Sequence, residues 1–166
     1  VIMNLNPKFP LYLPGVKNAN NDNVSIIGAN LREDITTIAY YTSGNSGIEL
    51  KFQNNYSTKD YASFADVLSH FIKESQLENV QRLGISVPGP VLDGKSNPVR
   101  LNWHLDVNEY QSKFGFEKVY MLNDQEAAAY GIGLLDDSQL DEIYTSEYRE
   151  KGNVAILAPG NGLGEA

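Results

Sequence analysis

The fold is decided by the stretch Leu122-Asn123-Asp124-Gln125-Glu126-Ala127-Ala128-Ala129-Tyr130-Gly131, in which a strand pattern changes into a helix pattern. The apolar residues 119–122 predict a buried strand, and the alanine-rich residues after the polar pair predict a helix. Asn123 and Asp124 are therefore expected at the carboxyl end of a strand. Ligand sites of open α/β sheets gather at such ends.

Two interpretations fit this polar pair. Asp124 could take a proton from a sugar hydroxyl while that hydroxyl attacks a phosphate, and Asn123 offers a polyol both a donor and an acceptor. Asn and Asp are also typical helix N-caps, whose side chains accept a hydrogen bond from a backbone N–H of the first turn. Spacing alone favours the cap without excluding the base.

The first half of the chain predicts a three-stranded antiparallel meander. Residues 24–29, 35–41 and 48–54 are short runs rich in β-branched and aromatic residues, and polar or glycine-containing turns separate them. A helix is expected to begin near Thr58, where Thr58 or Asp60 could cap it. Its buried face is defined by apolar residues at helical spacing: Tyr61, Phe64, Leu68 and Phe71.

The second half predicts alternating strands and helices. Strands are expected at 82–87, 119–122 and 153–158, with helices over 107–114 and from residue 123 towards 133. Three antiparallel strands followed by alternating elements imply an α/β fold whose sheet has a mixed, partly parallel order.

The composition excludes several classes of function. The chain has 166 residues, a formal net charge of −8, no cysteine and two histidines that are far apart. An acidic chain without a cluster of lysine and arginine is not expected to bind nucleic acid or an anionic membrane. We assign no metal ligand. No apolar run could span a membrane and no secretion signal is present, so a cytoplasmic location is expected.

Residues 1–23 predict an extended arm or linker, because prolines are followed by an asparagine-rich stretch. Residues 24–166 are expected to form the domain itself. The last residue, Ala166, closes a glycine-rich segment, where domains seldom end. We therefore expect the chain to be a piece of a longer protein.

Three segments resemble the bacterial glucokinase family in order and spacing. Residues 122–131 are similar to its Leu-Asn-Asp-Phe-Glu-Ala-x-Ala-Tyr-Gly segment. Residues 158–166 read Ala-Pro-Gly-Asn-Gly-Leu-Gly-Glu-Ala and resemble its Gly-Pro-Gly-Thr-Gly-Leu-Gly segment. Residues 85–91 resemble its Val-Ala-Gly-Pro-Val strand and loop, which is a weak signal on its own. The resemblance extends from about Val24 to the last residue.

The resemblance implies the small N-terminal domain of a two-domain kinase of the actin-like, RNase H-like class, without its C-terminal large domain. Such a kinase moves the γ-phosphate of ATP to the 6-hydroxyl of glucose, with Mg²⁺. Match to the motif would make Asp124 the general base, and Asn123 and Glu126 contacts of glucose. The resemblance also implies that residues 1–166 alone are inactive, because closure of the two domains around the sugar excludes water.

The resemblance further implies that the glycine-rich segment is a phosphate loop. Glycines let backbone N–H groups come close to phosphate oxygens. The implied ATP contacts are Gly160, Asn161, Gly162 and Gly164. A tight turn between domains is the alternative, because short glycine patterns often match by chance.

The family's first phosphate loop, a strand ending in Asp-x-Gly-Gly-Thr, is altered in this chain. A gapless alignment places Asn30 at the Asp, Arg32 and Glu33 at the two glycines and Asp34 at the threonine. Asn30 can still offer a carbonyl oxygen to a cation and is retained as a cofactor contact. The new side chains obstruct phosphate and the new carboxylates repel it, although Arg32 could pair with it. These residues favour an ordinary polar hairpin turn.

The family's Thr-Asn-x-x-Trp substrate loop corresponds to Val99-Arg100-Leu101-Asn102-Trp103, which has Val and Arg at the first two positions. Asn102 is a candidate sugar contact in a shifted register. Trp103 could stack on a sugar face or anchor the core.

Three functions are compatible with these residues. A glucokinase-like enzyme that phosphorylates a hexose is implied by the family, whereas the altered first loop and Arg100 favour a sugar-binding or regulatory relative with weak or absent kinase activity. An assembly module without a ligand is the third. Surface that the rest of a longer chain would cover also favours self-association, for example as a homodimer.

Overall fold

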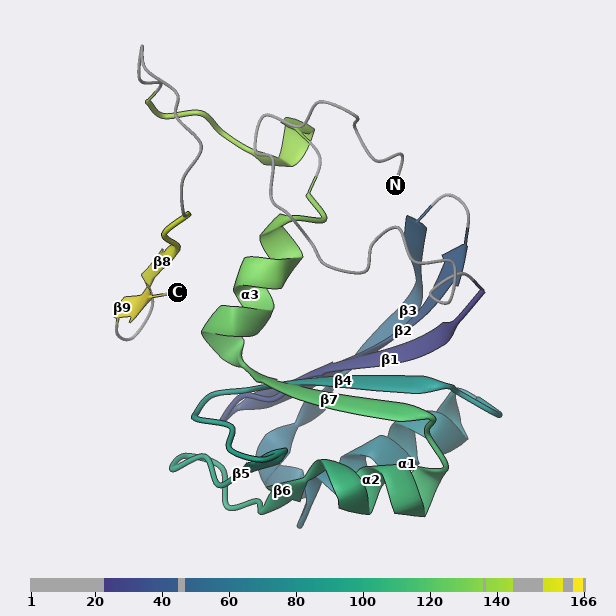
Figure 1. Cartoon of the computed structure of the whole chain (residues 1–166). Coiled ribbons are helices and arrows are strands. Elements are labelled where there is room, and N and C mark those ends of the chain that lie inside the picture. Colours follow the sequence, from purple (N-terminus) through teal and green to yellow (C-terminus); the bar gives the residue numbers. More distant parts are fainter. Residues whose placement is uncertain (1–22, 45–46, 136, 145–153, 160–162, 166) are drawn as a thin grey trace.

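The computed structural model describes residues 23–44, 47–135, 137–144, 154–159 and 163–165. Its main feature is a five-stranded sheet with the strand order β3-β2-β1-β4-β7 (Figure 1). The strands are β1 (Ser25–Asn30), β2 (Ile35–Gly44), β3 (Gly47–Ser57), β4 (Arg82–Val87) and β7 (Lys118–Asn123).

The first three strands are antiparallel neighbours, and β4 pairs in parallel with both β1 and β7. The predicted α/β fold with a mixed sheet and an antiparallel meander is therefore confirmed. The arm predicted for residues 1–23 lies outside the described residues, apart from Asn23.

The hydrophobic core lies on one face of this sheet. Alternate residues of β1 and β4, among them Ile27 and Leu83, are fully buried, because successive side chains of a strand point to opposite faces. Helices α1 (Phe64–Glu74) and α2 (Val107–Phe114) cover this face, below the sheet in Figure 1. The parallel strands that carry the site are thus backed by a packed layer.

Helix α1 begins later than predicted. Ser63 is its N-cap and accepts a hydrogen bond from the Asp66 N–H, whereas Thr58–Asp60 form a short 3-10 turn. Thr58 cannot serve as the cap because its buried hydroxyl donates to the Arg32 carbonyl instead, at 2.7 Å. The predicted buried face is otherwise present: Phe64, Leu68 and Phe71 are fully buried.

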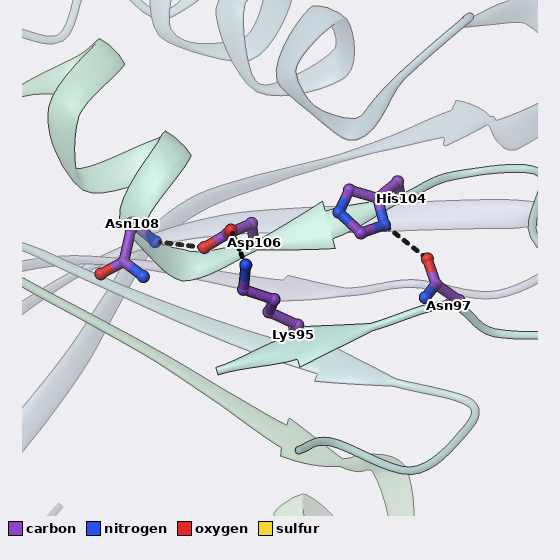
Figure 2. A network of polar contacts seen from close by, with 5 residues as sticks. All are labelled: Lys95, Asn97, His104, Asp106 and Asn108. Carbon is purple, nitrogen blue, oxygen red and sulfur yellow. Dashed lines mark hydrogen bonds and ion pairs between the residues drawn. The ribbon is translucent and has the colours of Figure 1, made fainter. Parts of the chain in front are cut away.

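A small hairpin leads into α2. Its strands are β5 (Lys95–Ser96) and β6 (Leu105–Asp106). Asp106 accepts from the Asn108 N–H as the helix cap and pairs with Lys95 at 3.0 Å, which holds the pKa of Asp106 below its usual value (Figure 2). The His104 ring lies 2.6 Å from Asn97 Oδ1 on the same hairpin (Figure 2).

The end of the chain is only loosely attached to the core. Helix α3 (Asp124–Ile132) follows β7 directly and has no fully buried residue. The strand predicted over residues 153–158 forms only as β8 (Leu157–Pro159), which pairs with β9 (Leu163–Glu165) and does not join the main sheet. No helix in the described part of the chain is long and apolar enough to cross a membrane.

Candidate functional site

Three parallel strands of the sheet end at one edge, which we call the carboxyl edge. Register pairs Asn30 of β1 with Ser86 of β4, and Val87 of β4 with Asn123 of β7. The parallel order therefore brings Asn30, Asn123 and Asp124 to the same edge, although they are distant in sequence.

The β7 turn, Asn123 and Asp124, is fixed by hydrogen bonds. Asn123 Oδ1 accepts from the Gln125 N–H at 2.9 Å, and Asn123 Nδ2 donates to the Gly89 carbonyl at 3.1 Å. Asp124 Oδ1 accepts from the same Gln125 N–H, also at 2.9 Å. Asn123 is thus the N-cap of α3, while Asp124 keeps a second oxygen, Oδ2, without a partner among the described residues.

The β7 turn can still meet a ligand. An Asn side chain has two donor hydrogens and two acceptor lone pairs, and Asn123 uses one of each. Asp124 is half-buried, and its Oδ1 is held by the backbone, which orients Oδ2 for a fixed approach. This arrangement suits a carboxylate that accepts a proton from a bound hydroxyl.

Glu126 is exposed in the first turn of α3. Residues two apart on a helix do not face each other, so Glu126 and Asp124 point to different sides of α3. Glu126 is, however, three residues after Asn123, a spacing at which side chains at the start of a helix are neighbours, and its contact with a sugar stays a prediction.

The β1 turn, residues 31–34, is closed by hydrogen bonds. The Leu31 N–H donates to the Ser86 carbonyl at 2.9 Å. Thr58 spans the turn, because its hydroxyl donates to the Arg32 carbonyl and its N–H donates to the Asp34 carbonyl at 3.0 Å. This geometry is that of a hairpin turn in which Leu31 is buried and the polar side chains of residues 32–34 are exposed.

The β1 turn does not fit a resident Mg²⁺. The amide of Asn30 is neutral, the carboxylate of Glu33 pairs with Arg100, and Asp34 Oδ1 accepts from the Ile35 N–H at 2.9 Å. Within the described residues, no three His, Asp or Glu side chains are grouped to hold a metal ion. A magnesium-binding role for Asn30 therefore has no support from its surroundings.

The 97–103 loop lies beside the β7 turn. Asn123 donates to the Gly89 carbonyl, and a Cβ added at Gly89 would lie 3.5 Å from Pro98. Trp103 is only 6% exposed, and its Nε1 donates to the Tyr61 carbonyl at 3.2 Å. Trp103 is therefore a core anchor, and the alternative of stacking on a sugar is wrong. Asn102 beside it is exposed and open to a ligand.

The glycine-rich segment is described only in part, since Gly160, Asn161 and Gly162 lie outside the described residues. Gly164 packs against the Gln125 side chain so closely that a Cβ at position 164 would overlap it. The structure thus places one glycine of the predicted phosphate loop next to the residue that follows Asp124.

Two features of the site were missed by sequence reasoning. The role of Thr58 in closing the β1 turn was hidden because a threonine before a helical pattern is a typical cap. The ion pair between Glu33 and Arg100, at 3.8 Å, joins residues far apart in sequence. Their opposite charges, at two positions where the family motifs are altered, could have indicated the pair.

A family model described as glucokinase matches residues 34–166. Among curated relatives, the glucokinase of Nostoc punctiforme is 23% identical over 124 residues, which cover 75% of this chain and 36% of the relative. The glucokinase of Saccharophagus degradans is 32% identical over 107 residues (64% and 33%), and that of Colwellia psychrerythraea is 27% identical over 152 residues (91% and 45%). The chain spans about a third to a half of the length of these relatives.

A solved glucokinase from an Antarctic psychrotroph has the same fold. The TM-score is 0.76 at 24% sequence identity, and the match covers 85% of this chain and 45% of that one. At this identity the likeness shows the fold alone.

Proposed function

This chain belongs to the glucokinase family, and we propose from that membership that its full-length protein phosphorylates glucose at the 6-hydroxyl with ATP as the donor. The observation that supports the proposal is the β7 turn, where Asp124 has one oxygen fixed by Gln125 and the other open. In this proposal, residues 24–166 form the small N-terminal domain, and the rest of a longer protein supplies the other wall of the cleft. In this proposal the protein is cytoplasmic, has no nucleic acid or membrane partner, and acts at the entry to glycolysis.

The proposed chemistry assigns Asp124 as the general base. Its Oδ2 accepts the proton of the 6-hydroxyl as the hydroxyl oxygen bonds to the terminal phosphorus of ATP. The bond from that phosphorus to the bridging oxygen breaks and ADP leaves. Asn123 is held by Gly89 and can direct its remaining donor and acceptor to the sugar. Asn102 and Glu126 are the further proposed sugar contacts. ATP supplies the phosphoryl group, and its proposed contacts are the segment at 160–164 and Asn30.

The test is a coupled glucose and ATP assay on the full-length protein. Asp124→Asn keeps the size and the oxygen that accepts from Gln125 but removes the base, so we expect kcat to fall by about 10²–10⁴-fold. Glucose binding, followed by calorimetry, should change little. Unchanged turnover in Asp124→Asn would contradict the assignment of the base.

A second candidate is a sugar-binding or regulatory protein with weak or absent kinase activity. It is favoured by the β1 turn, which Thr58 closes and which presents Arg32 and Glu33 where the family has glycines. Calorimetric binding of glucose without turnover in the full-length protein would support this candidate. An assembly module, for example a homodimer, would give no heat of binding with any sugar.

A further inference from the structure

Glu33 and Arg100 form an ion pair across the carboxyl edge. Arg100 Nη1 lies 3.8 Å from Glu33 Oε2, and the two side chains are 69% and 65% exposed. Exposed pairs of this kind contribute about 0–1 kcal/mol, because water screens them and both side chains lose freedom. The guanidinium of Arg100 can therefore leave Glu33 at little cost.

The backbones that carry this pair are both fixed. The β1 turn is held by Thr58 and Ser86, as described above. On the other side, the Leu101 N–H donates to the Pro98 carbonyl at 3.0 Å, and Leu101 and Trp103 are buried. Two backbone segments held by hydrogen bonds thus present one weakly paired cation at the end of β1.

From this arrangement we infer that Arg100 is a phosphate-binding residue of the site and that Glu33 occupies it as an internal anion when no phosphate is bound. A guanidinium can bind two phosphate oxygens at once, which is stronger than the long contact with one carboxylate oxygen. The inference rests on the proposed function, in which phosphate passes beside Asp124.

Other charges at the carboxyl edge make this exchange selective. Asp34 and Asp124 repel an anion, and Arg32 attracts it. Asp34 Oδ1 accepts from the Ile35 N–H at 2.9 Å, which holds that oxygen at the backbone. An anion therefore binds here only when it displaces Glu33, and removal of the Glu33 charge should strengthen binding.

The test is a titration of the 166-residue chain with inorganic phosphate at low salt, followed by NMR signals of the arginine Nε–H groups. Glu33→Gln should tighten phosphate binding about two- to fivefold, which is the worth of an exposed pair. Arg100→Gln should weaken it at least fivefold. Lys51→Gln is the matched control, because Lys51 pairs with Glu49 at 2.7 Å in the middle of β3, away from the carboxyl edge, and it should leave the affinity unchanged.

Two further titrations identify the source of the phosphate. Tighter binding of glucose 6-phosphate than of ATP by Glu33→Gln would assign Arg100 to the sugar phosphate, and the reverse would assign it to the nucleotide. Equal affinity of wild type, Glu33→Gln and Arg100→Gln for all three anions would overturn the inference. That result would leave the proposed function standing, since Asp124→Asn tests it separately by turnover.

Discussion

The two turns at the carboxyl edge differ in how much of the family's sequence and geometry they retain. The β7 turn retains both the family sequence and a geometry in which Asp124 has an oxygen open to a ligand. The β1 turn retains its place at the end of β1, but its backbone carbonyls are bound by Thr58 and its side chains bear charge. Strand order therefore preserves the location of a turn without preserving its chemistry.

Restoring the β1 turn is the strongest way to break this comparison. The combined variant N30D/R32G/E33G/D34T replaces the four altered residues by those of the family. If the two turns differ only in these side chains, the full-length variant should gain about 10²–10³-fold in kcat, the range typical of backbone donors that stabilise transition-state charge. The coupled glucose and ATP assay measures it.

The control for this gain is the same variant with Asp124→Asn added, which should return to background. No gain in turnover would show that the altered turn is not what limits catalysis.

Removing the Thr58 hydroxyl should open the β1 turn. Thr58→Val leaves the Arg32 carbonyl and the buried Thr36 hydroxyl, 2.9 Å from Thr58 Oγ1, without their partner. Each unsatisfied buried group costs about 1–3 kcal/mol, so we expect the free energy of unfolding to fall by about 2–3 kcal/mol in a urea titration.

Thr37→Val, next to Thr36 on β2, is the matched control. Its hydroxyl donates to Asn55 Oδ1 at 2.8 Å on the exposed face, so its loss should cost less than about 0.5 kcal/mol. Equal losses in the two variants would mean that Thr58 has no special part in the turn.

Two variants of Asn123 separate its roles in the β7 turn. Asn123→Ala removes both the cap bond to Gln125 and the bond to Gly89, and should lower the free energy of unfolding by about 1–2 kcal/mol. Asn123→Asp keeps an oxygen for the cap and loses only the donor to Gly89, so its loss should be smaller. Chemical denaturation measures the loss in free energy of unfolding for each variant. Equal losses would show that the bond to Gly89, and not the cap, accounts for the stabilisation by Asn123.

The sequence predicted those features that depend on local pattern. The strand before Asn123 and the helix after it were set by an apolar run and an alanine-rich run, and the meander by three β-branched runs. Parallel pairing then follows from alternating elements, so the gathering of Asn30 and Asp124 at one edge could be predicted in outline.

The details that depend on distant partners could not be predicted. Local pattern predicts Thr58 as a helix cap, whereas its hydroxyl binds the Arg32 carbonyl, 26 positions away in the sequence. Trp103 was left between two roles, since only the packed structure shows its Nε1 bound to the Tyr61 carbonyl. Sequence pattern sets which residues end a strand, but tertiary hydrogen bonds decide which of their atoms stay free.

The smallest expected effect concerns β3, the strand that leads to Thr58. Burial raises the pKa of Tyr56 to about 12, and its hydroxyl donates to Glu74 Oε2 of α1 at 2.8 Å. In the unfolded chain a tyrosine loses its proton near pH 10. The stabilisation is therefore complete below about pH 10 and is lost as the pH rises through about 12.

Tyr56→Phe tests how much the hydrogen bond from Tyr56 to Glu74 stabilises the fold. Because the variant lacks this hydrogen bond, its free energy of unfolding at neutral pH should be about 0.5–1.5 kcal/mol lower than that of the wild type. Its urea midpoint should also fall less steeply than that of the wild type between pH 10 and 12. Subtracting the two pH curves removes the contribution of the other tyrosines and the lysines. If the curves are parallel, ionisation of Tyr56 is not coupled to unfolding.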